Sequence, residues 1–313
     1  MMISAGFLFG GSGGQYPKMG AVLYVQDATF RSGIDECAYY VDRWLPSPLA
    51  QTMFDTGTDA ILARIDYMSV GLFAIQYALV RYWQANGLRL HAALAHSLGA
   101  HAAACAAEAI DCEEACRLLE ARCRSIGGQC AAGAMGVAEE TEAFVIDHMR
   151  EIGCEAEIAA VNGKRWTTFS GRTDDVVYLI DSLIAHGIRA RRHPISHAFH
   201  SSLMDAALPS YAASIRSIPS RRPSIPLFTT TAGAVDRVCE AFWLAQLRAP
   251  MRFAPAYRQF RAAFAGIVIE VGPADAFCRF AAEVDPVSTI VPSLSQSTQS
   301  ICVETLRRIR APA

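Results

Sequence analysis

Residues 88–101 read Leu-Arg-Leu-His-Ala-Ala-Leu-Ala-His-Ser-Leu-Gly-Ala-His, with Ala95-His96-Ser97-Leu98-Gly99 at the centre. An apolar run leads into the serine, and an alanine-rich segment leads out of it. This order predicts a nucleophile elbow, a sharp strand-to-helix turn that lifts a serine Oγ clear of the backbone. Because the turn strains the serine φ and ψ, the residues two positions before and after it must be small. Ala95 and Gly99 meet that requirement.

The helix expected after the elbow would point its N-terminal N–H groups at Ser97, which is a suitable place to stabilise an oxyanion. A small-x-Ser-x-Gly pattern also occurs in many unrelated chains. Its interpretation therefore depends on the rest of the sequence.

The composition limits the class of protein. The chain has 313 residues, 52% hydrophobic and 19% charged, with a formal net charge of −2. This length predicts one large α/β domain, alone or with a smaller inserted domain. The near-neutral charge gives no electrostatic reason to expect nucleic acid or a membrane surface as a partner. The chain has no apolar run of the about 18 residues that a membrane span needs and no signal-peptide pattern, so we expect a cytoplasmic protein.

Ten cysteines are present, with no C-x-x-C pair. Cys112, Cys116, Cys123 and Cys130 are spaced roughly along one stripe of a helix. A zinc site uses more closely paired ligands, whereas cysteine commonly acts as a small buried apolar residue. We therefore predict no metal site.

A glycine-rich turn, Gly10-Gly-Ser-Gly-Gly-Gln-Tyr-Pro, follows a short apolar strand at residues 5–9. A dinucleotide-binding G-x-G-x-x-G motif would need glycine at position 16, which is Tyr16, and no P-loop Gly-Lys-Ser/Thr is present. The loop can bring backbone N–H groups close to a ligand oxygen, and a plain tight turn is the alternative interpretation.

The other elements follow from periodicity and capping signals. We expect helices over most of residues 20–87, a strand at 88–94, and a helix at 100–110. Asp111 and Glu114 form a capping box for a helix that continues to about residue 124 and breaks at Gly127-Gly128. Later strands are expected at 226–230, 266–271 and 289–291, before a short C-terminal helix.

Residues 131–194 form a distinct pattern. We expect strands at 134–138, 157–161, 166–170 and 188–192, and helices at 140–152 and 174–186. This β-α-β-β-α-β order is typical of a ferredoxin-like unit. We therefore predict an inserted ferredoxin-like subdomain at 131–194, within a large α/β domain formed by residues 1–130 and 195–313 around a central, mainly parallel sheet.

Six features in order carry a family resemblance. They are Phe7-Leu-Phe-Gly-Gly-Ser-Gly-Gly-Gln-Tyr-Pro-Lys-Met-Gly, Ala95-His-Ser-Leu-Gly, Arg122 placed 25 residues after the serine, Ser196-His-Ala-Phe-His-Ser-Ser-Leu-Met, Arg248-Ala-Pro-Met-Arg-Phe and Ile269-Glu-Val-Gly-Pro. Over nearly its whole length the chain resembles malonyl-CoA:acyl-carrier-protein transacylases of the fatty-acid and polyketide acyltransferase family. The resemblance implies an α/β-hydrolase-like fold for the large domain.

The resemblance also implies the reacting residues. Ser97 is the expected nucleophile. A serine hydroxyl needs a neutral imidazole to take its proton at pH 7. His200 matches the family base, with His197 as the alternative, whereas His96 is expected to pack against neighbouring structure. In the family a backbone carbonyl orients the base. The residue that supplies this carbonyl would fall near Arg252 here.

The remaining site residues are expected to hold the substrate. The backbone N–H groups of Leu98 and of Ser12, where the family has glutamine, would form the oxyanion hole. Arg122 can hold the free carboxylate of a malonyl group through two parallel hydrogen bonds. The His197-Ala-Phe-His200 pattern accompanies malonyl selectivity in the family, and the bulk of Phe199 would fill the space of an α-methyl group.

Several positions depart from the family pattern. Ser12 replaces glutamine, Gly14 replaces serine, Met68-Ser69-Val70 replaces Thr-Gln-Pro, and Ala100-His101 replaces Glu-Tyr. Ser69 and Gln15 are expected, with His197, to line the substrate pocket. The smaller side chains would leave room for a longer acyl chain or a water molecule.

We therefore expect a ping-pong transacylase with no bound cofactor. Its substrate would be a coenzyme A thioester, and its acceptor the phosphopantetheine thiol of an acyl carrier protein. The alternatives are a hydrolase that clears stalled acyl groups, and a transferase of longer acyl chains. The Ser97 and His200 pair argues against a non-enzymatic scaffold. We also expect a discrete, trans-acting monomer, with a basic docking surface at Arg189–Arg192 or Arg221–Arg222.

Overall fold

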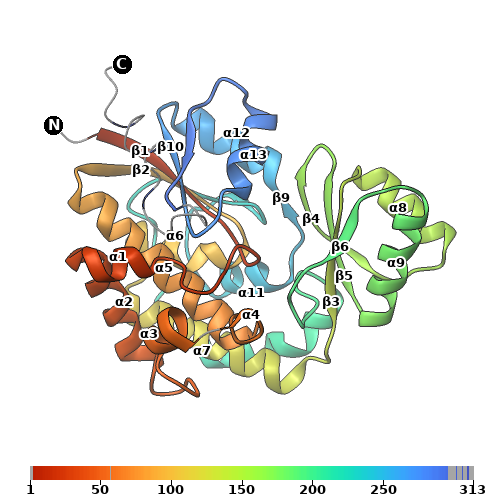
Figure 1. Ribbon diagram of the computed structural model, residues 1–313, viewed down its shortest axis with the longest axis horizontal. Coiled ribbons are helices and arrows are strands. Elements are labelled where there is room, and N and C mark those ends of the chain that lie inside the picture. Colours follow the sequence, from red (N-terminus) through yellow and green to blue (C-terminus); the bar gives the residue numbers. More distant parts are fainter. Residues whose placement is uncertain (1–2, 57, 295–300, 302–304, 306–308, 310–313) are drawn as a thin grey trace.

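A computed structural model describes residues 3–309 except 57, 295–300, 302–304 and 306–308. Its larger sheet has the strand order β11-β10-β1-β2-β7-β8 (Figure 1). Five strands are parallel, and β8 runs antiparallel to β7. The strands are β1 (Ile3–Phe9), β2 (Leu88–Ala95), β7 (Leu227–Thr229), β8 (Gly233–Ala234), β10 (Val268–Val271) and β11 (Ile290–Pro292).

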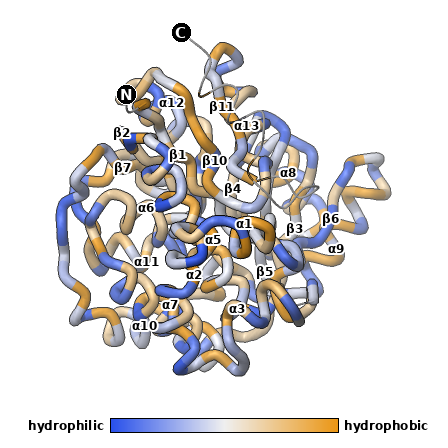
Figure 2. Tube along the Cα trace, turned by 60° about the vertical axis from the view of Figure 1, so that its left-hand side comes forward, coloured by the Kyte–Doolittle hydropathy of each residue, from blue (hydrophilic) through white to orange (hydrophobic). Residues whose placement is uncertain are grey.

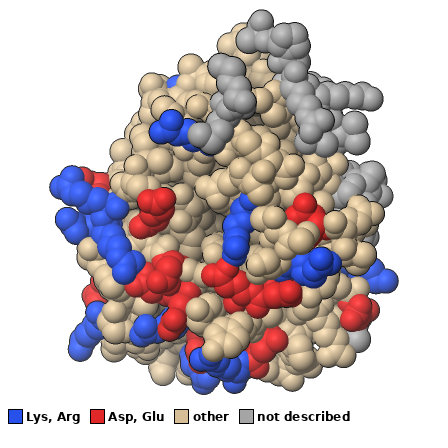
Figure 3. Space-filling view, turned by 90° about the vertical axis from the view of Figure 1, so that its left-hand side faces the viewer, with Lys and Arg blue, Asp and Glu red and all other residues tan. Residues whose placement is uncertain are grey.

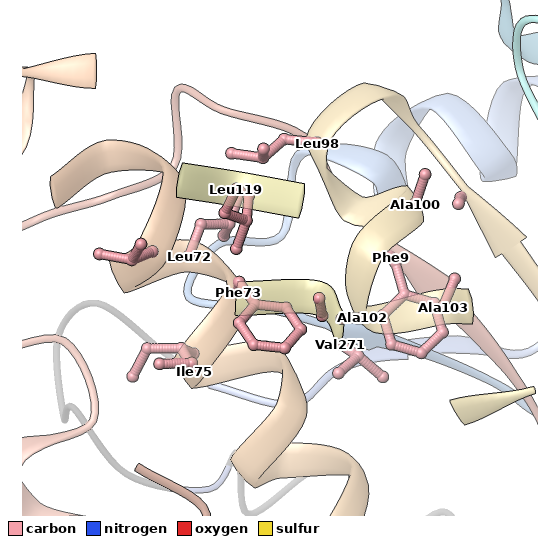
Figure 4. Packing of buried hydrophobic residues seen from close by; sticks show 14 of the residues in the cluster. Phe9, Leu72, Phe73, Ile75, Leu98, Ala100, Ala102, Ala103, Leu119 and Val271 are labelled. Carbon is pink, nitrogen blue, oxygen red and sulfur yellow. The ribbon is translucent and has the colours of Figure 1, made fainter. Parts of the chain in front are cut away.

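Helices cover both faces of this sheet. Phe7 and Phe9 of β1 contribute to a core with the long helix α5 (Ile65–Ala85), whereas Leu8 faces a second core with α12 (Phe253–Ala263) and α13 (Ala276–Val284). Figure 4 shows Phe9, Leu72, Phe73 and Val271 packing in the first of these cores. Burial on both faces explains the near-continuous apolar sequence of β1. In Figure 2 the chain at β10, the strand paired with β1, is largely orange and therefore hydrophobic.

The remaining helices, apart from those of the smaller sheet, come before and after β2 in the chain. They are α1 (Ala21–Gln26), α2 (Ala28–Val41), α3 (Leu49–Gln51), the π-turn η1 (Thr52–Thr56), α4 (Asp59–Leu62), α6 (Ala100–Ala106), α7 (Cys112–Gln129), η3 (Ser202–Ala207), α10 (Leu208–Ile215) and α11 (Glu240–Arg248). Cys112, Cys116 and Cys123 of α7 are buried, as expected for small apolar residues. No described helix is both long enough and apolar enough to cross a membrane.

The second sheet has the strand order β6-β3-β5-β4-β9. Its elements are β3 (Ala134–Ala138), α8 (Glu142–Glu151), β4 (Glu157–Gly163), β5 (Trp166–Gly171), α9 (Thr173–Ala185) and β6 (Ala190–Arg192), joined by β9 (Met251–Arg252) from later in the chain. The first four strands pair antiparallel, and β9 runs parallel to β4. With α8 and α9 packed against one face, this is the predicted ferredoxin-like arrangement, and the predicted fold class is confirmed.

Two helix boundaries differ from the prediction. Helix α6 ends at Ala106 instead of residue 110, because Glu108 adopts φ 56° and cannot continue a right-handed helix. Helix α7 continues through Gly127-Gly128 to Gln129, and the Cys130 N–H still donates to the Ile126 carbonyl. A glycine in the last turn costs little helix stability, so the pair does not break the helix. The predicted C-terminal helix lies mostly outside the described residues.

Candidate active site

The turn between β2 and α6 has the predicted elbow conformation. Ser97 begins the short helix η2 (Ser97–Gly99) with φ 49°, a left-handed value that is strained for a serine. A Cβ on Gly99 would lie 2.5 Å from the Phe9 carbonyl oxygen and 2.7 Å from that of Gly10. The elbow therefore packs directly on the end of β1, and glycine at position 99 is required by this contact.

Ser97 and His200 are 103 residues apart in the chain and meet in the structure. Ser97 Oγ lies 2.8 Å from His200 Nε2, and His200 Nδ1 lies 2.8 Å from the Ala249 carbonyl oxygen. Because a carbonyl only accepts hydrogen bonds, Nδ1 carries the proton and Nε2 is free to accept the Ser97 hydroxyl proton. The orienting carbonyl is that of Ala249, three residues before Arg252. Helix α11 ends at Arg248, and the next carbonyl turns toward the ring.

His200 is fully buried, and burial lowers the pKa of its imidazole to about 4. The hydrogen bond to the Ala249 carbonyl opposes this lowering of the pKa, and the positive charges of Arg122 and Arg248 contribute to it. The imidazole is therefore neutral at pH 7, the form that a proton acceptor needs.

The other histidines near the elbow form hydrogen bonds with other groups. His96 Nδ1 lies 3.1 Å from Thr230 Oγ1, and its ring packs on Phe277, as expected for a packing residue. His101 Nδ1 donates to the Leu98 carbonyl at 3.0 Å. His197 Nδ1 lies 3.1 Å from the Ser196 hydroxyl.

The glycine-rich loop after β1 lies against the elbow. A Cβ on Gly11 would be 3.3 Å from Ser97 Cβ and 3.1 Å from the His96 carbonyl oxygen. Ser12 and Gln15 line the cavity in front of Ser97. The Gln15 side-chain oxygen accepts the Gly13 N–H at 2.5 Å, so this side chain stabilises its own loop.

Arg122 is buried, with 4% of its surface exposed. One of its N–H groups donates to Ser69 Oγ at 3.2 Å, and the guanidinium carbon lies 4.5 Å from the centre of the Phe199 ring. Burial lowers the pKa of Arg122, but a guanidinium stays charged at neutral pH. No aspartate or glutamate among residues that the structure describes forms an ion pair with it.

A cavity of about 380 Å³ opens above Ser97 between the two sheets. The glycine-rich loop, Phe199 and His200 form one wall. The other walls are formed by the smaller sheet with the segment after β6, and by helix α13 with the turn before it; they include Met135, Val137, Ala160, Asn162, Trp166, Thr168, Arg191, His193, Phe277, Arg279 and Phe280. Arg122, Ser69, His197 and Leu98 do not line this cavity; Arg122 and Ser69 lie behind the Phe199 ring.

Four wall residues have buried polar groups to which the sequence analysis assigned no role. Asn162 Oδ1 and His193 Nδ1 have no hydrogen-bond partner among the described residues. Glu270 accepts the N–H groups of Phe277 and Cys278 in the first turn of α13, and its burial raises the pKa of its carboxyl to about 7. Gln76 is the fourth, a polar residue in an otherwise apolar part of α5. That contrast is the only signal of its importance in the sequence.

The site contains no recognisable metal centre. Within the described part of the chain, no group of three or more His, Cys, Asp or Glu side chains is arranged to hold a metal ion.

Comparisons with known proteins place this geometry in context. The family model described as "Acyl transferase domain" matches residues 6–311. A PKS-NRPS hybrid synthetase of Aspergillus candidus is 30% identical over 307 residues, which are 94% of this chain and 12% of the synthetase. A loading acyltransferase from the avermectin modular polyketide synthase is 25% identical, with a TM-score of 0.91, and the match covers 98% of this chain and 100% of that one.

A malonyl CoA-acyl carrier protein transacylase from Coxiella burnetii has the same fold, with 23% identity, a TM-score of 0.85 and 99% of each chain covered. The chain spans only 4% to 13% of the length of the curated polyketide synthases and synthetases that it matches.

Proposed function

The chain belongs to the acyl transferase domain family, and on this premise we propose that it transfers a malonyl group from coenzyme A to an acyl carrier protein through an ester on Ser97. The observation that carries the malonyl assignment is the buried guanidinium of Arg122, which has no acidic partner among the described residues. A buried charge without a counter-ion is costly, and a substrate carboxylate that extends from the cavity past the Phe199 ring would compensate it.

The first half-reaction follows from the Ser97 and His200 geometry. Nε2 takes the hydroxyl proton as Oγ attacks the thioester carbonyl, and the Ala249 carbonyl holds the protonated ring through Nδ1. The backbone N–H groups of Leu98 and Ser12 would hold the negative charge on the carbonyl oxygen. The carbon–sulfur bond then breaks, and His200 returns the proton to the departing coenzyme A thiolate.

The second half-reaction reverses these steps with a different thiol. The phosphopantetheine thiol of the carrier protein gives its proton to His200 and attacks the Ser97 ester, which releases the serine and leaves malonyl on the carrier. This is a ping-pong scheme, and it needs no bound cofactor. On the cavity wall, Asn162 Oδ1 offers an acceptor for an amide N–H group of the pantetheine arm, and His193 Nδ1 offers a second unpartnered polar atom.

The ion pairs of the arginines support one of the two predicted basic docking surfaces over the other. Arg221 pairs with Glu114, Arg222 with Asp236, and Arg189 with Glu139. Of the two predicted clusters, this leaves Arg191 and Arg192 without an ion pair among the described residues, and Arg191 lines the cavity mouth. On the face that carries α1 and α2, acidic and basic residues are mixed over the lower half (Figure 3). We therefore propose that the acidic carrier protein docks beside β6.

A hydrolase is the second candidate function. Ser12, which lines the cavity, is smaller than the glutamine that the family resemblance implies, and the space it leaves would admit water. Such an enzyme would release free acid from the Ser97 ester instead of passing the acyl group to a thiol.

Intact-mass spectrometry separates these candidates. The protein is incubated with malonyl-CoA, with acetyl-CoA, and with a longer acyl-carrier thioester. A malonyl adduct that is absent in Ser97→Ala and is discharged by a carrier protein supports the transferase. Free acid released from the longer thioester without a malonyl adduct would show that the hydrolase assignment is right.

A further inference from the structure

Gln76 lies in the part of α5 that passes beneath the glycine-rich loop. Its side chain is fully buried, and its neighbours Leu72, Ile75 and Leu79 are buried as well. Its Nε2 donates two hydrogen bonds, one to the Gly10 carbonyl at 2.8 Å and one to the Val271 carbonyl at 3.0 Å.

These contacts settle which end of the amide faces the loop. Both partners are carbonyl oxygens, so only the NH₂ group can satisfy them. Gln76 Oε1 is left buried, with no hydrogen-bond partner among residues that the structure describes. A methionine would fill the same space without a buried unpaired oxygen, so packing alone does not explain a glutamine here.

The two carbonyls mark where β1 and β10 separate. The last paired residues of these parallel strands are Phe9 and Val271. Beyond this pair the chain from β1 enters the glycine-rich loop, and the chain from β10 enters the Gly272-Pro273 turn. The Gln76 amide thus connects the two strands just beyond their last paired residues.

We propose that Gln76 is a positioning residue for the oxyanion hole; this inference rests on the proposed acyl transfer at Ser97. The Gly10 carbonyl and the Gly11 N–H belong to one planar trans peptide unit and point in opposite directions. Holding the carbonyl toward α5 therefore turns the Gly11 N–H away from α5. It also fixes the start of the segment that presents the Ser12 N–H to the cavity.

The elbow constrains the same peptide from the other side. Gly99 packs on the Gly10 carbonyl so closely that a Cβ would lie 2.7 Å from its oxygen. The Gly10 carbonyl is thus held between Gln76 and the residue two positions after Ser97. The distance between Ser97 and the glycine-rich loop therefore depends on the Gln76 side chain, although Gln76 contacts neither Ser97 nor His200.

The test compares Gln76→Met with Trp83→Phe. The methionine keeps the volume and removes both donors. Trp83 is a matched control, because its indole N–H makes a buried 2.9 Å hydrogen bond to Ser293 from the same helix, away from the loop. Single-turnover acylation by malonyl-CoA, KM and thermal midpoint are measured for both variants and the wild type.

We expect Gln76→Met to slow acylation about tenfold to a hundredfold while KM changes less than about threefold, because misplaced oxyanion donors act on the transition state. Trp83→Phe should lower the thermal midpoint at least as much as Gln76→Met does. Its acylation rate should stay at the wild-type value. Wild-type acylation in Gln76→Met, or equal rate losses in both variants, would overturn the proposal.

A second probe separates failure of this inference from failure of the proposed function. If the wild type forms no malonyl adduct, the proposed substrate is wrong. The role of Gln76 is then judged by the rate at which a fluorophosphonate labels Ser97, because its phosphoryl oxygen also enters the oxyanion hole. Slower labelling of Gln76→Met supports the inference, and unchanged labelling overturns it.

Discussion

The groups on the two sides of Ser97 are held in place by different kinds of contact. The reaction centre consists of Ser97, His200 and the Ala249 carbonyl, and both ring nitrogens of His200 have a partner at 2.8 Å. The proposed recognition pocket consists of Arg122, Ser69 and Phe199. There the guanidinium has one 3.2 Å hydrogen bond and one aromatic contact.

The difference shows which changes each side tolerates. In the reaction centre, one of the two partners of His200 is a backbone carbonyl, and the proposed oxyanion donors are backbone N–H groups, so neighbouring side chains can vary. In the recognition pocket every contact comes from a side chain, and the charge of Arg122 is left for a ligand to balance. Substitutions in the recognition pocket should therefore change which substrate reacts, whereas loss of either reacting side chain should stop the reaction with every substrate.

The largest effect is expected in the reaction centre. His200→Ala removes the proton acceptor, so acylation of Ser97 should slow by roughly 10²–10⁴-fold for charged and uncharged acyl groups alike. His197→Ala is the matched control from the same motif, and it should lose less than about tenfold because its ring is bonded to Ser196. Stopped-flow release of coenzyme A measures both. Equal losses would show that the assignment of the base to His200 is wrong.

The next effect is expected in the recognition pocket. Arg122→Ala removes the buried cation, so kcat/KM for malonyl-CoA should fall about 10²–10³-fold, as for a buried ion pair that loses one partner. Reaction with acetyl-CoA should persist. Arg124→Ala, two residues further along α7 and in an exposed pair with Glu120, is the control. If malonyl and acetyl transfer fall together, Arg122 has a structural role only.

Phe199 tests selectivity within the recognition pocket. Phe199→Ser removes the bulk beneath Arg122, and the ratio of kcat/KM for methylmalonyl-CoA to that for malonyl-CoA should rise about tenfold, the usual worth of one methyl group in a pocket. Taking a ratio cancels any general loss from the missing contact between ring and guanidinium. A ratio equal to that of the wild type would place the α-carbon of the substrate away from this ring.

The reaction centre should also show an unusual pH dependence. The pKa of His200 is lowered by burial to about 4, so its ring stays neutral until the pH falls through that value. Acylation should then change less than about twofold between pH 7 and pH 5. A histidine with the ordinary pKa of about 6.5 would lose roughly thirtyfold over the same range. A rate that halves near pH 6.5 would show that the titrating base is more exposed than His200.

The sequence predicts the reaction centre better than its surroundings for a physical reason. The elbow is a local turn, so the small residues that it requires stand within two positions of Ser97. The partners of Gln76 are carbonyls 66 and 195 residues away. Every residue has a carbonyl, so no residue type marks the ones that a fold selects. The same limit explains why the sequence predicts only that the carbonyl orienting His200 lies near Arg252, whereas the structure identifies it as that of Ala249.

The smallest effect distinguishes backbone from side-chain chemistry at the oxyanion loop. Ser12→Ala removes a hydroxyl from the cavity wall but keeps the N–H that the proposed oxyanion hole uses. Malonyl transfer should therefore stay close to the wild-type rate, and the yield of free acid should not change. A loss of more than about tenfold would mean that the hydroxyl itself stabilises the transition state. Retained transfer with more free acid would instead mean that Ser12 limits the access of water to the Ser97 ester. This position, one of those at which the chain departs from the family pattern, would then decide between the transferase and the hydrolase.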